Sequence, residues 1–264
     1  MFVDSHCHLD FPELREGLQS FLDEMQAHQV THALCVAVSL KGLPGVLALA
    51  ASTPNLFASV GIHPDYEDVE EASVAQLVTL AAHPKVVAIG ETGLDYYRLQ
   101  GDLEWQRARF RTHIRAAKEV KKPLIIHTRS AAEDTIRILK EEGADAVGGV
   151  MHCFTESWDI AQQAMDLGFL ISFSGIVTFK NAVALKEVAQ RVPLNSMLIE
   201  TDSPYLSPVP FRGKLNHPAL VRYVAEEIAR LRETSVDAIG QATSTNFFER
   251  FLAPPHRAEF SSMQ

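Results

Sequence analysis

The sequence predicts an α/β protein whose strands form a closed (β/α)8 barrel of the TIM type, and three observations support this prediction. Short apolar runs rich in Val, Ile, Phe and Ala recur eight times along the 264 residues. Most of these runs are continuously apolar, as expected for strands that are covered on both faces. Amphipathic stretches lie between them, so the pattern implies parallel strands joined by crossover helices. Eight such units in a chain of this length favour a closed barrel over an open, doubly wound sheet.

The eight strands are expected at the apolar runs themselves, which are 2–6, 31–38, 56–62, 86–91, 123–128, 148–153, 169–175 and 196–201. The clearest helices are 14–28, 104–120 and 131–143. The last of these ends at Gly143, a residue that commonly follows the C-terminus of a helix. Two closing helices are expected within 217–252. No repeat or linker divides the chain, so we predict a single domain over 1–252 and a loosely ordered tail over 253–264.

Composition and charge exclude several classes of protein. The formal net charge of −9 disfavours a broad nonspecific grip on nucleic acid, although a small site for one strand end remains compatible with it. Met1 leads directly into the first apolar run without the basic region of a signal peptide, and no window reaches the roughly 20 apolar residues of a membrane span. The three cysteines do not indicate a disulfide framework. We therefore expect a cytoplasmic protein that does not associate with membranes.

Metal-binding residue types stand at the ends of five predicted strands, where the catalytic groups of such barrels gather. They are His6, His8, Glu91, His127, His152 and Asp202. Each alone has a bland alternative: a histidine can be a capped polar residue, Glu91 half of a buried ion pair, and Asp202 a helix cap. Together they would be costly to bury without a cation or partners. His6 and His8 project to the same side of a strand and can bind one ion, whereas Cys7 points away.

Four imidazoles and two carboxylates exceed the needs of one tetrahedral zinc ion with an open position, so we expect two divalent ions. A shared carboxylate would hold them roughly 3.5–4 Å apart, and a water between them would become the nucleophile. Mixed nitrogen and oxygen ligands suit Mg, Mn or Zn without selecting one. One division gives the first ion His6, His8 and Asp202, the second ion His127 and His152, and both ions Glu91.

Several motifs occur in an order that resembles the TatD family of metal-dependent hydrolases, within the amidohydrolase-like barrel superfamily. They are DSHCHLD (4–10), GIHP (61–64), IGETGLDYY (89–97), PLIIHTR (123–129), HCF (152–154), SFSGIVTFKN (172–181), ETDSPYL (200–206) and RGKLNHP (212–218). The resemblance implies the barrel fold, a divalent-metal centre on the six residues named above, and deoxyribonuclease activity, often of the 3′-to-5′ exonuclease type. Asp65 replaces a second histidine of many relatives, and His217 replaces a frequent glutamate. Both positions lie outside the implied ligand set.

The resemblance leads us to expect metal-assisted hydrolysis of phosphodiester bonds in DNA. Glu91 and Asp202 are the predicted catalytic residues, with Glu91 shared by both ions and Asp202 also accepting the proton of the nucleophile. Glu200 is expected either to orient a ligand histidine or to be a buried structural carboxylate. DNA strand ends are the expected substrate, and nothing in the sequence indicates an obligate protein partner.

Further polar residues are candidates for substrate contacts. Arg129 closes the fifth strand and can reach the same mouth of the barrel, whereas Arg212 and Asn216 lie in the loop after the last strand, where barrels often bind phosphate. Arginine suits bidentate phosphate contacts. His63 and Asp95 also fall at strand ends, and we expect them near the substrate. Three aromatic residues of these loops could stack on a base or simply pack: Tyr96, Tyr97 and Phe179.

Two other functions remain open at this point. The same metal centre could cleave another ester or an amide, for example in aminoacyl-tRNA or in a small molecule, because a fold does not determine its substrate. A noncatalytic metal-dependent binding module would require the loss of a ligand or of the proton acceptor. All six ligand positions are filled, which favours an enzyme.

Overall fold

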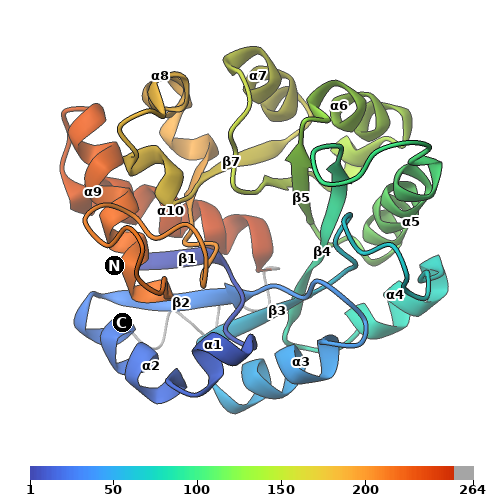
Figure 1. Cartoon of the computed structure of the whole chain (residues 1–264), viewed down its shortest axis with the longest axis horizontal. Helices are drawn as coiled ribbons and strands as arrows, with labels where there is room; N and C mark the ends of the chain where they lie inside the picture. The colour runs from blue at the N-terminus through green and yellow to red at the C-terminus, as the bar shows by residue number, and fades with distance from the viewer. Residues whose placement is uncertain (253–264) are drawn as a thin grey trace.

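The computed structural model describes residues 1–252, and the tail predicted over 253–264 lies outside the described residues. Eight parallel strands pair in sequential order, and an isolated bridge between Cys7 and Ser203 brings the region after the last strand back to the first. Helices surround the strands on the outside (Figure 1). The predicted single-domain (β/α)8 barrel is therefore confirmed.

The strands are β1 Phe2–Cys7, β2 Val30–Cys35, β3 Leu56–Val60, β4 Val86–Asp95, β5 Leu124–Arg129, β6 Gly149–Met151, β7 Phe169–Phe173 and β8 Met197–Ile199. The α-helices are α1 Pro12–Arg15, α2 Leu18–Ala27, α3 Leu43–Ser52, α4 Val74–Ala81, α5 Glu104–Val120, α6 Ala132–Glu141, α7 Trp158–Asp166, α8 Val183–Arg191, α9 Val221–Leu231 and α10 Val236–Phe251. Short 3-10 helices are η1 Ala144–Ala146, η2 Gly175–Thr178, η3 Leu194–Ser196 and η4 Pro218–Leu220. None of the helices within residues 1–252 has the length and apolar character needed to cross a membrane.

Most predicted elements are present, with one clear error. The helix expected over 14–28 is two helices, α1 and α2, because Gly17 separates them and disfavours a continuous helix. The ring of Phe21 lies 2.9 Å from the position that a Cβ at residue 17 would occupy. Strands β6 and β8 are shorter than predicted, and β6 is followed directly by His152 and Cys153 of the cavity wall.

The interior of the barrel is filled by apolar side chains, and α10 closes one end of it. Each strand contributes to this cluster, which contains Val3, Leu34, Phe57, Val87, Ile125, Val150, Leu170 and Leu198. Phe247 and Phe251 of α10 pack against these residues. The amide of Asn246 donates to the carbonyl oxygen of Met197 at the start of β8 (2.8 Å). The helix therefore seals the N-terminal ends of the strands and leaves the opposite mouth open.

The packing of α10 can be tested by comparing its Gly240 with Gly45, a helical glycine in open surroundings. At Gly240 an added Cβ would lie 2.6 Å from Phe2 Cε1 and 2.7 Å from the carbonyl oxygen of Met1, whereas at Gly45 of α3 nothing lies within 4 Å. We predict that Gly240→Ala lowers the free energy of unfolding by about 1–3 kcal/mol through overpacking. Gly45→Ala should leave it unchanged or raise it by up to about 1 kcal/mol. Urea unfolding of both variants checks this, and equal stability would contradict the packing described.

Candidate metal centre

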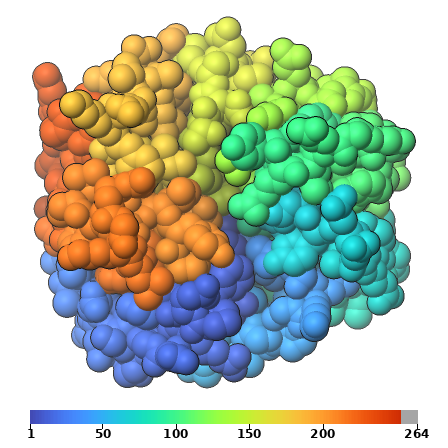
Figure 2. Space-filling view, viewed as in Figure 1, coloured from blue at the N-terminus to red at the C-terminus, as the bar shows by residue number. Residues whose placement is uncertain are grey.

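A cavity of about 500 Å³ opens at the C-terminal ends of the strands. In the space-filling view the face is hollowed near its middle, where the blue, orange and green segments meet (Figure 2). The cavity is lined by residues from loops at several strand ends and from the ends of β4 and β5. Five of the six predicted ligands line it, and His6 is the exception because it is fully buried.

Glu91 of β4 lies at the centre of the predicted ligands. Its Oε1 atom is 3.1 Å from His127 Nδ1 and 3.1 Å from His152 Nε2. Its Oε2 atom is 3.3 Å from His6 Nε2. The two oxygens of this carboxylate therefore face different histidines, as expected for a group that is shared between two ions.

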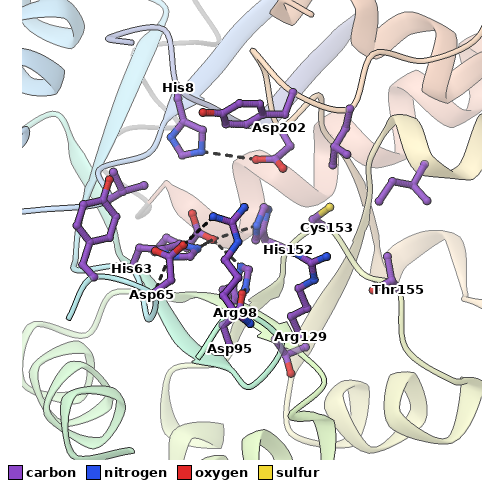
Figure 3. A pocket seen from close by; sticks show the side chains of 18 of the residues that line it. His8, His63, Asp65, Asp95, Arg98, Arg129, His152, Cys153, Thr155 and Asp202 are labelled. Atoms are coloured by element: carbon purple, nitrogen blue, oxygen red, sulfur yellow. Dashed lines mark hydrogen bonds and ion pairs between the residues drawn. The ribbon is translucent and has the colours of Figure 1, made fainter. Parts of the chain in front are cut away.

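Asp202 completes the other side of the centre. Its Oδ1 atom is 3.5 Å from His8 Nε2 and 3.7 Å from His6 Nε2, and Figure 3 joins His8 and Asp202 by a dashed line. The backbone N–H of Asp202 donates to the carbonyl oxygen of His6 (2.9 Å) and helps to hold the residue at a φ of 55°. A left-handed conformation at a residue other than glycine costs free energy and commonly marks functional sites.

The donor set fits divalent cations. The Nε2 atoms of His6 and His8 lie 3.3 Å apart, so the two rings direct these nitrogens at the same point. Donor atoms of His6, His152 and Asp202 lie within 4.8 Å of one another, as do those of His6, His8 and Glu91. The Nδ1 atom of His6 is buried without a hydrogen-bond partner among residues 1–252. Such a convergence of buried imidazoles and carboxylates matches the ligands preferred by Zn, Mn and related ions.

The outer nitrogens of three of the predicted ligand histidines contact oxygen acceptors. His8 Nδ1 donates to the carbonyl oxygen of Val36 (3.0 Å), and His127 Nε2 donates to Asp95 Oδ2 (3.1 Å). His152 Nδ1 donates to Glu200 Oε1 (2.8 Å). Each contact leaves the inner ring nitrogen directed at the centre with its lone pair, the arrangement common to metal-binding histidines.

Glu200, predicted either to orient a ligand histidine or to be a buried structural carboxylate, lies directly behind the His152 ring. Its side chain is fully buried, and it also accepts hydrogen bonds from the backbone N–H of Cys153 (2.7 Å) and the hydroxyl of Ser172 (2.6 Å). Three donors thus hold the carboxylate in place behind His152. Its position behind the ring, outside the cavity lining, makes it a positioning residue.

The charges of the centre compensate one another. Burial alone would raise the pKa of Glu91, but the positive charges of His152, His63 and His6 hold it well below its usual range. Burial would lower the pKa of His152, but the charges of Glu200 and Glu91 raise it well above the usual value. A bound cation takes over the positive charge that protons bring to such imidazoles, so metal binding releases protons.

The two arginines that were predicted to contact the substrate lie in different surroundings. Arg129 belongs to the cavity wall, and its guanidinium lies 3.9 Å from the centre of the Tyr97 ring. Arg212 stacks on Phe179 at 3.6 Å and is not among the residues that line the cavity. Tyr96 donates its hydroxyl to Asp134 Oδ2 (2.7 Å) and is not among the residues that line the cavity. Arg129 is therefore the better-placed cation for a substrate phosphate.

The prediction that Asn216 contacts the substrate is wrong. Its side chain is fully buried and its amide donates to the carbonyl oxygens of Thr201 (2.9 Å) and Tyr205. Both amide hydrogens are thus used to fold the loop after β8, and none remains for a phosphate. His217 lies outside the cavity lining too, and its ring stacks on Phe21 of α2 with 4.9 Å between centroids.

Four residues near the centre were missed or given a smaller role by the sequence predictions. His63, predicted as a substrate contact, lies with its Nε2 atom 3.4 Å from Glu91 Oε1. Asp65 contacts both His63 and Arg98, an arginine of the cavity wall that the sequence did not single out. The proximity of Arg98 to the end of β4 was the available signal. Phe11, which stacks on His8 with 4.8 Å between ring centroids, was also missed.

Comparisons with known proteins agree with this centre. A family model described as "TatD related DNase" matches residues 3–252. An uncharacterized metal-dependent hydrolase of Escherichia coli, YcfH, is 46% identical over 94% of this chain and 95% of its own length. YabD of Bacillus subtilis, described in the same words, is 43% identical over 93% of this chain and 97% of its own. The crystal structure of the E. coli TatD homologue YjjV superposes with a TM-score of 0.88 at 32% identity, covering 96% of this chain and 98% of that one.

The contact between Glu200 and His152 leads to a prediction about metal affinity. Glu200→Gln keeps the shape of the side chain but removes the charge that fixes the His152 tautomer, so we expect metal affinity to fall about 10–100-fold. Competition with a chelating dye measures this change. The exposed Glu187 of α8 provides the control Glu187→Gln, which removes an equal charge outside the cavity lining and should leave metal affinity unchanged. Equal affinities of all three proteins would contradict the positioning role.

Proposed function

The chain belongs to the TatD-related DNase family and is a metal-dependent hydrolase, and on this premise we propose that it is a deoxyribonuclease that removes nucleotides from DNA strand ends. The observation that carries the two-ion part of the proposal is the position of Glu91, whose oxygens face different histidines. The family description and the placement of Arg129 in the cavity wall support DNA as the substrate.

The residues of the centre divide the chemical work between them. Divalent ions, when bound, neutralise the charge of a phosphate and acidify water. Glu91 is almost enclosed, with its side chain 3% exposed, and serves to hold the two halves of the centre together. Asp202 is more open, at 17%, and lines the cavity. Its carboxylate is therefore the group that can accept a proton from an attacking water.

The cavity suits a strand end rather than a long duplex. Its volume of about 500 Å³ is on the scale of pockets for small ligands, which span roughly 300–1,000 Å³. Arg129 offers a guanidinium for a phosphate at the wall, and that guanidinium stacks on the exposed ring of Tyr97. The net charge of −9 also opposes extended binding along a duplex.

The experiment that tests the proposed function is a substrate panel with metal-loaded protein. We expect release of nucleotides from end-labelled single-stranded DNA, and no turnover by Glu91→Ala, which loses the shared carboxylate. The panel includes aminoacyl-tRNA and simple carboxylic esters and amides, because the same centre could act on those bonds. Turnover of an ester or amide without any cleavage of DNA would replace the proposed substrate and leave the hydrolase in place.

The position of Arg129 leads to a prediction about substrate binding. Loss of a charge-assisted hydrogen bond costs about 1.5–3 kcal/mol, so Arg129→Ala should lower kcat/KM about 10–150-fold without changing metal content. Arg129→Lys should recover part of this loss, because it keeps the charge without the bidentate geometry. Arg212→Ala is the matched control, since this arginine lies outside the cavity lining, and it should have the smaller effect. The reverse order of the two alanine variants would contradict the assignment.

A further inference from the structure

His63 lies three residues beyond the end of β3 and is one of the histidines that contact the Glu91 carboxylate. Its Nε2 atom is 3.4 Å from Glu91 Oε1, the same oxygen that contacts His127 Nδ1 at 3.1 Å. The rings of His63 and His127 lie 4.5 Å apart between centroids. Donor atoms of His63, Glu91 and His127 all fall within 4.8 Å of one another. These three residues form a third convergent donor group beside the two already described.

The outer nitrogen of His63 has the same kind of partner as the outer nitrogens of the ligand histidines. Its Nδ1 atom contacts Asp65 Oδ1 at 2.5 Å, as His152 Nδ1 contacts Glu200 at 2.8 Å. The second oxygen of Asp65 accepts from Arg98 Nη1 (3.2 Å), so the carboxylate is held at both ends. Figure 3 shows His63, Asp65 and Arg98 together at one side of the cavity.

We propose that His63 is a further metal ligand of this centre, on the side of His127, and that Asp65 is the positioning residue that holds it there. A carboxylate on Nδ1 keeps the proton on that nitrogen and leaves the lone pair of Nε2 directed at Glu91. This inference rests on the metal centre that the proposed function uses, and it adds a donor outside the six expected residues.

Two alternative roles for His63 fit the contacts less well. A histidine that binds substrate needs a nitrogen directed at open space in the cavity, but both nitrogens of His63 face carboxylates. A purely structural ion pair would not require a second carboxylate on the far side of the ring. The backbone N–H of Asp65 also lies 3.2 Å from His63 Nδ1. Because a carboxylate oxygen can only accept, Nδ1 must carry the proton in order to donate to Asp65 Oδ1.

Metal titration of chelator-treated protein tests the inference without any substrate. Co²⁺ is the probe, because its visible absorption reports the number and kind of ligands, and elemental analysis gives the number of ions bound. We expect His63→Ala to weaken one Co²⁺ site at least about 10-fold and to change its spectrum, while the other site is retained. Asp65→Asn should weaken the same site by about 10-fold, with a smaller spectral change, because the ring stays in place but loses its charged partner.

Matched variants separate this role from a structural one. Asp68→Asn removes an equal charge from an exposed position in the same loop and should leave both Co²⁺ sites unchanged. Circular dichroism confirms that each variant is folded, and His63→Gln offers a less disruptive replacement that should show the same loss at one site. Unchanged Co²⁺ affinity and spectrum in folded His63→Ala or His63→Gln would overturn the inference. That outcome would leave the proposed nuclease activity untouched, because the substrate panel tests it separately.

Discussion

The enclosure of one carboxylate, Glu91, is the constraint on which the rest of the site depends. Its side chain is only 3% exposed, and nitrogens of His6, His63, His127 and His152 all lie within 3.4 Å of its oxygens. Taking a carboxylate out of water costs several kcal/mol unless positive charge compensates it. The barrel supplies that charge by directing several strand ends at the same point, and the apolar core beneath them, sealed by α10, keeps the assembly in place.

A second layer of oxygen acceptors gives the centre its orientation. Carboxylates stand behind three of the imidazoles, Glu200 behind His152, Asp95 behind His127 and Asp65 behind His63. Burial opposes ionisation of Asp95, but His127 and the backbone N–H groups of Arg98 and Tyr97 lower its pKa to about 2, so it stays charged at neutral pH. Fixed negative charge on the outside keeps the outer ring nitrogens protonated and the inner nitrogens free to bind a cation.

The barrel and the convergence of the six expected ligands could be predicted from the sequence because both follow from local patterns. Apolar runs mark strands, and the residue that follows a parallel strand must lie at the mouth of the barrel. Contacts across loops are not written in such patterns. Asn216 was assigned to the substrate although its amide folds its own loop. His63 was expected near the substrate and does line the cavity, but only the fold shows that it also contacts Glu91.

A crystal structure of the Mn²⁺-loaded protein with anomalous scattering data tests the shared carboxylate most directly. We expect two anomalous peaks roughly 3.5–4 Å apart, with one oxygen of Glu91 bound to each ion. A single peak, or two peaks that Glu91 does not join, would contradict the shared carboxylate on which the description of this centre rests.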